Sequence, residues 1–194
     1  PTGTPCLPDA KYVADLPIPD NEKIAPGAAF TKSWRVRSTG CAAWSAGTEL
    51  VFVDGERLEA PASVAVPATA PESTADISVD MRAPTAPGTY RSTWQLRGPD
   101  GVFFGGRIYA QIVVPGPLTI SFVADRTTVK QGQCATLSWQ VENAVSILIN
   151  GKEVAAQGSS VECPPATTGF ELTAKDIQGN WKRATLIINV ETGY

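Results

Sequence analysis

Histidine is absent from this 194-residue sequence, and several other marks of a chemical site are missing with it. Without histidine, Ser-His-Asp and Cys-His catalysis are excluded, and so is a mixed cysteine–histidine zinc site. The sequence also has no CxxC pair and no GxGxxG or GKS phosphate loop. Asp76 and Asp80 alternate on one predicted strand, but such carboxylates are expected on a solvated outer face. We therefore expect no catalytic residue, no metal and no cofactor.

Charge is sparse as well, at 18% charged residues with a formal net charge of −3. A mildly acidic chain without a basic cluster suits nucleic acid poorly, because that affinity depends on neutralising phosphates. No apolar run approaches the roughly 20 residues of a membrane-spanning helix. We expect neither a nucleic-acid partner nor membrane insertion. Because the sequence starts at Pro1 rather than Met, we take it as part of a longer protein.

What the sequence does contain is alternation of apolar and polar residues. Residues 30–37, 74–82 and 90–96 each alternate between a mainly apolar and a polar face, which predicts half-buried strands. No helical repeat of ten or more residues occurs. Hydrophobic residues make up 43% of the chain, enough for a buried core. These patterns predict an all-β fold.

Glycine and proline divide the strands into two sets. Pro115-Gly116-Pro117 separates them, so we expect one domain over residues 1–115, its first eight residues resembling a linker, and another over 116–194. Asp54-Gly55 and Asn150-Gly151 are typical of hairpin turns, and Gly105-Gly106 indicates a bulge. The number and spacing of short strands predict two tandem immunoglobulin-like β-sandwiches.

The four cysteines fall into two local pairs, one in each half of the chain. An even number divided in this way favours one disulfide per domain in an oxidising compartment, although four buried free thiols would be the alternative. Cys134 alternates out of phase with Leu137 and Trp139, so a disulfide there would lie at the edge or end of the sandwich. The cysteines are Cys6, Cys41, Cys134 and Cys163.

The aromatic residues are divided between core and surface. Trp34 and Trp94 lie on apolar faces and are expected in the core. Trp44 follows a loop, so its pattern leaves core and ligand contact open, and Trp181 near a domain end is expected to be partly exposed. Phe103 and Phe104 are adjacent in one strand, so one of the two rings should point outward. We take Phe103, Phe104 and Trp181 as candidate partner contacts.

Residues 9–114 resemble the four-tryptophan family, the Ig-like domain of neighbour-of-Brca autophagy receptors and of exported bacterial proteins. Three stretches carry the resemblance: FTKSWRVR at 30–37, Trp44 with LVF at 50–52, and APTAPGTYRSTWQLR at 83–97. It implies a mostly buried aromatic set of Phe30, Trp34, Trp44, Trp94 and Tyr109, where Tyr109 replaces the fourth tryptophan.

The cysteine positions resemble the bacterial, secreted branch of that family, in which Cys6 and Cys41 would pair. Residues 117–190 resemble the small Ig-like domains of bacterial surface proteins, again with a disulfide implied. We therefore expect a non-catalytic, extracytoplasmic tandem module of a bacterial secreted or cell-surface protein. It would bind a protein partner or act as a spacer. A carbohydrate-binding accessory module of an exported enzyme is the alternative.

Overall fold

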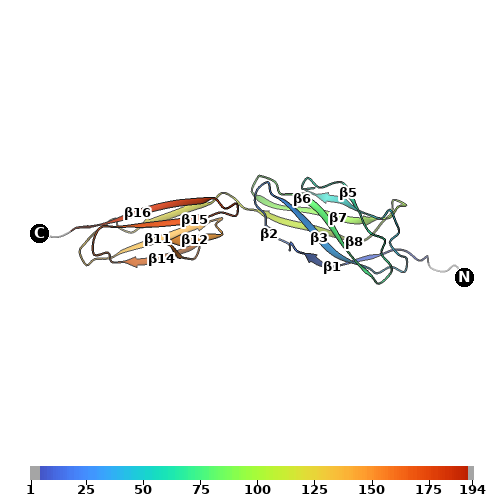
Figure 1. Ribbon diagram of the computed structural model, residues 1–194, viewed down its shortest axis with the longest axis horizontal. Coiled ribbons are helices and arrows are strands. Elements are labelled where there is room, and N and C mark those ends of the chain that lie inside the picture. Colours follow the sequence, from blue (N-terminus) through green and yellow to red (C-terminus); the bar gives the residue numbers. More distant parts are fainter. Residues whose placement is uncertain (1–4, 192–194) are drawn as a thin grey trace. The chain divides into compact units, whose positions relative to one another are not determined.

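The computed structural model describes residues 5–191, and every regular element in that range is a β-strand (Figure 1). The chain divides into two compact units, one ending at Pro115 and the other beginning at Gly116. The all-β prediction is therefore confirmed. The start of the predicted linker, residues 1–4, lies outside the described residues.

The first unit is a sandwich of two sheets. One sheet has three antiparallel strands, in the order β1 (Ala10–Leu16), β3 (Ala29–Ser38) and β6 (Thr74–Arg82). The other has five strands, in the order β2 (Glu22–Lys23), β8 (Phe103–Val114), β7 (Gly88–Arg97), β4 (Glu49–Gly55) and β5 (Ser63–Ala65). Only the pairing of β2 with β8 is parallel in this sheet.

The second unit repeats this topology strand for strand. Its three-stranded sheet has the order β14 (Gln157–Glu162), β11 (Ala135–Glu142) and β9 (Thr119–Ala124). Its five-stranded sheet has the order β10 (Thr128–Lys130), β16 (Trp181–Glu191), β15 (Thr168–Lys175), β12 (Ser146–Ile149) and β13 (Lys152–Glu153). As in the first unit, the second strand pairs in parallel with the eighth. The prediction of two tandem sandwiches is confirmed.

Alternation fills the core of the first unit from both sheets. In β6 every second side chain is buried, from Ala75 to Met81, and the residues between them are exposed. Trp34, Trp44 and Trp94 are at most 1% exposed. Buried aromatic rings of this size remove the largest apolar area from water per residue, so they dominate the core energetics.

Both predicted hairpins are present, but only the one at Asn150-Gly151 has a two-residue turn; β4 and β5 pair antiparallel through a longer connection. Asn150 and Gly151 join β12 to β13 with φ of 49° and 77°, as a primed two-residue turn requires. Gly55 instead ends β4 in register with Ser92, and β5 begins only at Ser63. A Cβ on Gly55 would lie 2.2 Å from the Arg91 carbonyl oxygen, so this glycine permits close strand approach rather than a turn.

Gly105 lies in the predicted bulge and brings β1 against β8. The β7–β8 register passes from Trp94–Ile108 to Leu96–Phe104, so the extra residues fall on β8. Gly105 has φ of 68°, and an added Cβ would lie 2.6 Å from the Cβ of Ala10. The start of β1 therefore lies directly against the bulge of β8.

Candidate functional site

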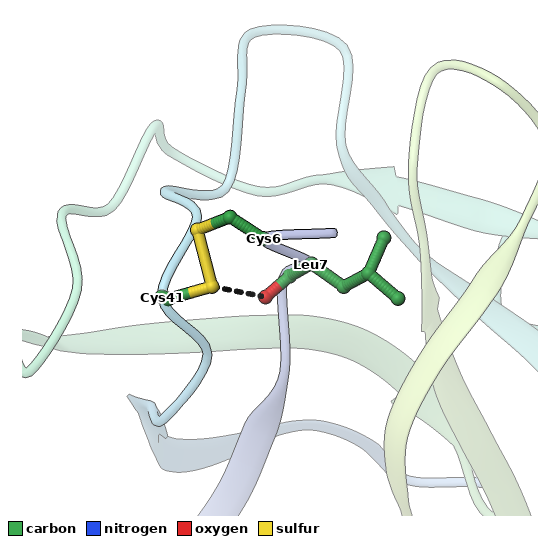
Figure 2. Close-up of a disulfide and its surroundings, with 3 residues drawn as sticks. All are labelled: Cys6, Leu7 and Cys41. Carbon is green, nitrogen blue, oxygen red and sulfur yellow. Dashed lines mark hydrogen bonds between the residues drawn. A yellow bond between two sulfur atoms is a disulfide. The ribbon is translucent and has the colours of Figure 1, made fainter. Parts of the chain in front are cut away.

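Both predicted disulfides are present. Cys6–Cys41 joins the segment before β1 to the loop after β3, with Cα atoms 5.4 Å apart (Figure 2). Cys134–Cys163 joins the residues that flank β11 and β14, which are neighbours in one sheet. This second bond closes the end of a strand ladder and does not cross the core, as its alternation predicted.

The first disulfide belongs to a closely packed tether. The Asp9 carbonyl oxygen accepts hydrogen bonds from the Thr39 amide and the Trp44 indole, each at 3.1 Å. The Leu7 carbonyl oxygen lies 3.9 Å from Cys41 Sγ, a contact without a shared proton because a disulfide sulfur carries none. A Cβ on Gly40 would lie 2.3 Å from the Asp9 nitrogen, so the loop accepts only glycine at this distance.

The tether presents an apolar side chain to solvent. Leu7 is 62% exposed, and Figure 2 shows its side chain pointing away from the disulfide. Val102, directly before β8, is 60% exposed, and Phe103, the first residue of β8, is 44% exposed. We call the following residues the apolar end surface: Leu7, Pro8, Val102, Phe103 and Phe104.

Two hollows lie on the apolar end surface. One, of about 130 Å³, is lined by Asp100 and all five residues of the surface. The other, of about 210 Å³, shares Pro8, Asp100 and Phe104 with the first and extends to Trp44. The surface is therefore continuous between the tether and the start of β8.

The adjacent rings at the start of β8 diverge. Phe104 is half-buried, and its ring centroid lies 6.2 Å from that of Trp44. Phe103 points outward, with the Arg97 guanidinium 5.9 Å from its ring centroid. Phe103 is therefore the ring of this pair that a partner can reach.

A buried ion pair lies on the core side of β3, at a position that the sequence reasoning missed. Lys32 is 1% exposed, and its Nζ lies 2.8 Å from Asp15 Oδ1 and donates to the Ile18 carbonyl oxygen. The ammonium also lies 5.8 Å from the Trp34 ring centroid. The sequence does carry a signal for this burial. Lys32 is two residues from Trp34 in the strand, so both side chains lie on the same face of the sheet.

Next to this pair is a pocket of about 240 Å³ that is enclosed by β1, by β8 and by the turn that precedes β2. Its lining combines aromatic, acidic and basic side chains with one aliphatic residue: Tyr12, Asp15, Asp20, Arg107, Ile108 and Tyr109. Asp20 Oδ1 is buried and has no hydrogen-bond partner among residues 5–191. We call this the Asp20 pocket.

Tyr109 is the exception in the aromatic set. It lies on the outward alternation of β8, half-buried, with the Arg91 guanidinium 3.7 Å from its ring centroid. Its backbone oxygen accepts the Trp34 indole hydrogen at 2.9 Å. Interaction with the neighbouring Asp20 carboxylate, which favours the protonated phenol, raises the pKa of Tyr109. Phe30 is half-buried against the core.

The tryptophans weighed as ligand contacts differ in exposure. Trp44 is buried and donates to Asp9, which excludes ring stacking on a sugar. Trp181 at the start of β16 is 56% exposed, and Lys175 Nζ lies 5.5 Å from its ring centroid. Of these two rings, Trp181 alone remains accessible.

The carboxylates of β6 are engaged in cross-strand contacts on its outer face. Asp76 accepts two hydrogen bonds from Arg35, each at 2.7 Å, and Asp80 accepts one from Thr31 at 2.6 Å. Across the described range, no three His, Cys, Asp or Glu side chains gather as a metal site. Within the same range, no helix long and apolar enough to cross a membrane is found.

Comparison with known proteins identifies the first unit. Residues 17–114 match the family model described as the Ig-like domain from next to BRCA1 gene. Zebrafish "Protein ILRUN" is 34% identical over 107 residues, covering 55% of this chain and 38% of that protein. "Protein NBR1 homolog" of Arabidopsis thaliana is 31% identical over 170 residues, covering 84% of this chain and 24% of that protein.

The chain thus spans well under half the length of these relatives. A solved fragment of titin, I67–I69, aligns with a TM-score of 0.53 at 11% identity, covering 96% of this chain and 66% of the fragment. That likeness shows the immunoglobulin fold alone. The relatives named here are eukaryotic and do not support the bacterial branch. The match over residues 17–114 shows that the chain belongs to the family of Ig-like domains from next to BRCA1 gene.

Proposed function

We propose that this chain is a non-catalytic protein-binding module of a larger protein, and that the partner docks on the apolar end surface. The observation that carries this proposal is the exposure of Leu7, Val102 and Phe103 together at one end of the first unit. Scattered exposed apolar residues are ordinary, but a contiguous set with hollows between its side chains is typical of interaction sites.

The surface is also built to bind without a large ordering cost. Leu7 is fixed by the disulfide of Cys6 and by its own carbonyl oxygen, which accepts a hydrogen bond from the Ala42 amide in the loop after β3. Phe104 is held against Trp44. Because ordering of side chains and loops opposes association, a surface that is already fixed retains more of its contact free energy.

We further propose an extracytoplasmic location, secreted or on a cell surface, and an origin in the bacterial exported branch. Two disulfides in a chain of this size support the oxidising compartment. Mass spectrometry of the native protein under non-reducing conditions, with free thiols alkylated first, is expected to recover both disulfide-linked peptides. Recovery of four alkylated cysteines would contradict the location.

Carbohydrate binding, as an accessory module of an exported enzyme, is the second candidate, through the exposed ring of Trp181. Its test is affinity electrophoresis in soluble polysaccharides with the Trp181→Ala variant. Retardation of the wild type that the variant loses would support it. Equal mobility of the two proteins in every polysaccharide would contradict it.

Site-directed photo-cross-linking tests the docking surface. Phe103 is replaced by a photoreactive phenylalanine analogue in the full chain, and Val161, which is 67% exposed in the second unit, serves as the control position. We expect one discrete adduct from the native cellular extract at position 103 and its loss when Leu7→Ser is added. Adducts that are equal at both positions, or unchanged by Leu7→Ser, would contradict docking at the apolar end surface.

A further inference from the structure

The Asp20 pocket and the apolar end surface lie on the same edge of the first unit. At this edge Ala10 lies close to Gly105, so the start of β1 lies against β8. Along the two segments, Leu7 and Phe103 precede this close approach, and Tyr12 and Tyr109 follow it. Along β8, Phe104 and Tyr109 are five residues apart, at most about 17 Å in an extended strand. One extended segment of a partner can therefore reach both.

The size of the pocket suits a side chain. At about 240 Å³ it lies below the roughly 300–1,000 Å³ of pockets that enclose whole small molecules. Two of its walls are tyrosine rings, of which Tyr12 is 47% exposed and Tyr109 half-buried. Aromatic faces attract ammonium and guanidinium groups when these lie within about 6 Å of the ring centroid.

The pocket contains a hydrogen-bond acceptor that lacks a donor. Asp20 Oδ1 is buried and, within the described part of the chain, accepts no hydrogen bond. A buried carboxylate oxygen without a donor costs free energy that a bound N–H group would recover. Asp15 has less to offer a ligand, because its carboxylate already pairs with Lys32.

The pocket has charged groups of both signs, and two carboxylates, Asp15 and Asp20, line it together with the tyrosines. Burial and then the charge of Asp15 raise the pKa of Tyr12, and Asp20 raises that of Tyr109. Positive charge comes from Lys32, which pairs with Asp15, from Arg91, 3.7 Å from the Tyr109 ring centroid, and from Arg107. The Arg107 side chain is exposed and forms no ion pair with any described residue. It can turn to solvent when another cation enters.

We propose that the Asp20 pocket binds a basic side chain, a lysine or arginine, that the partner presents about five residues from its apolar docking residue. Asp20 accepts the hydrogen bond of the cationic group, and the rings of Tyr12 and Tyr109 flank it. This inference rests on the proposed protein-binding function and specifies the chemistry of the partner.

The test is a titration of the whole chain followed by ¹⁵N–¹H NMR, with small probes in place of the partner. The probes are the N-acetyl methylamides of lysine, arginine and norleucine, and the last has the lysine carbon chain without the charge. We expect millimolar binding of lysine or arginine, with shifts at the amides of Asp20 and Tyr109, and no saturable shift with norleucine. The absence of binding by both cations, or equal binding of norleucine, would overturn the proposal.

Variants separate binding in the pocket from general charge effects. Asp20→Asn is expected to weaken lysine or arginine binding at least about tenfold. Asp54→Asn removes the same charge from an exposed position outside the pocket and should leave binding unchanged. Arg107→Gln should tighten it, a gain that a misfolded variant cannot produce. Equal affinity of Asp20→Asn and wild type, or weakened binding by Arg107→Gln, would contradict the assignment.

The outcome is independent of the docking test at Phe103. The probes need neither a partner nor the apolar end surface, and cross-linking at Phe103 does not need the pocket. Cross-linking without cation binding would overturn the pocket alone, whereas cation binding without cross-linking would overturn docking at the apolar end surface.

Discussion

Substitution of Asp15 by asparagine gives the sharpest prediction about stability in the first unit. The change leaves the Lys32 ammonium buried, with the Ile18 carbonyl oxygen as its remaining hydrogen-bond acceptor. Removing one member of a buried ion pair costs about 3–5 kcal/mol, because the other charge stays desolvated. Asp15 is 18% exposed, so water relieves part of this cost, and we expect a loss of about 3 kcal/mol.

The assay must report on the first unit alone, because two units need not unfold together. The indole N–H resonances of Trp34, Trp44 and Trp94 report the first unit, and those of Trp139 and Trp181 report the second. Urea titration followed by these signals gives a separate midpoint for each unit. Only the midpoint of the first unit should fall.

Two companion variants fix the interpretation. Asp76→Asn removes an ion pair with Arg35 in which both side chains are nearly half exposed, so it should cost less than about 1 kcal/mol. Lys32→Met combined with Asp15→Asn should recover most of the loss, because no buried charge remains. A loss below about 1 kcal/mol for Asp15→Asn, or no recovery in the double variant, would refute the reasoning.

Three further predictions concern Gly40, the second disulfide and Tyr109. Gly40→Ala should destabilise the first unit by at least about 1–3 kcal/mol, because the added Cβ would clash with the Asp9 backbone. Gly106→Ala is the control and should cost less, because its Cβ would meet no atom within 4 Å. Urea midpoints measure both changes. Replacing Cys134 and Cys163 by alanine opens a loop with a sequence separation of 29 and should cost the second unit about 3–4 kcal/mol, read from the Trp139 and Trp181 signals. The pKa of Tyr109 is raised above its ordinary value near 10. The protonated phenol therefore contributes to stability below that pH, and this contribution is lost as the pH rises through the folded-state pKa. Asp20→Asn should lower the pKa of Tyr109 in an ultraviolet titration.

Alternation was enough to predict the strands of the sandwich and much of its core. Ala75, Ile77, Val79 and Met81 are buried where the period of two places them, and the disulfides follow the division of the cysteines. These features depend on short-range pattern and on the pairing of local cysteines. Both can be read before the fold is known.

Features that depend on contacts between distant strands were not predictable. Asp54-Gly55 has the composition of a turn, but the approach of Arg91 from another strand explains the glycine. Tyr109 was placed with the core aromatics, yet it lies on the outward alternation of β8 beneath Arg91. The Asp20 pocket brings residues of β1 and β8 together, and nothing in either segment marks it alone.

The central claim is that the apolar end surface binds a protein partner, and the affinity of the cross-linked partner measures it most directly. Once the adduct at Phe103 identifies the partner, calorimetric titration compares wild type with Phe103→Ser and with Val161→Ser, a control in the second unit. We predict that Phe103→Ser weakens binding at least about tenfold, as loss of an aromatic anchor should, and that Val161→Ser binds like wild type. Equal affinity of wild type and Phe103→Ser would contradict the account.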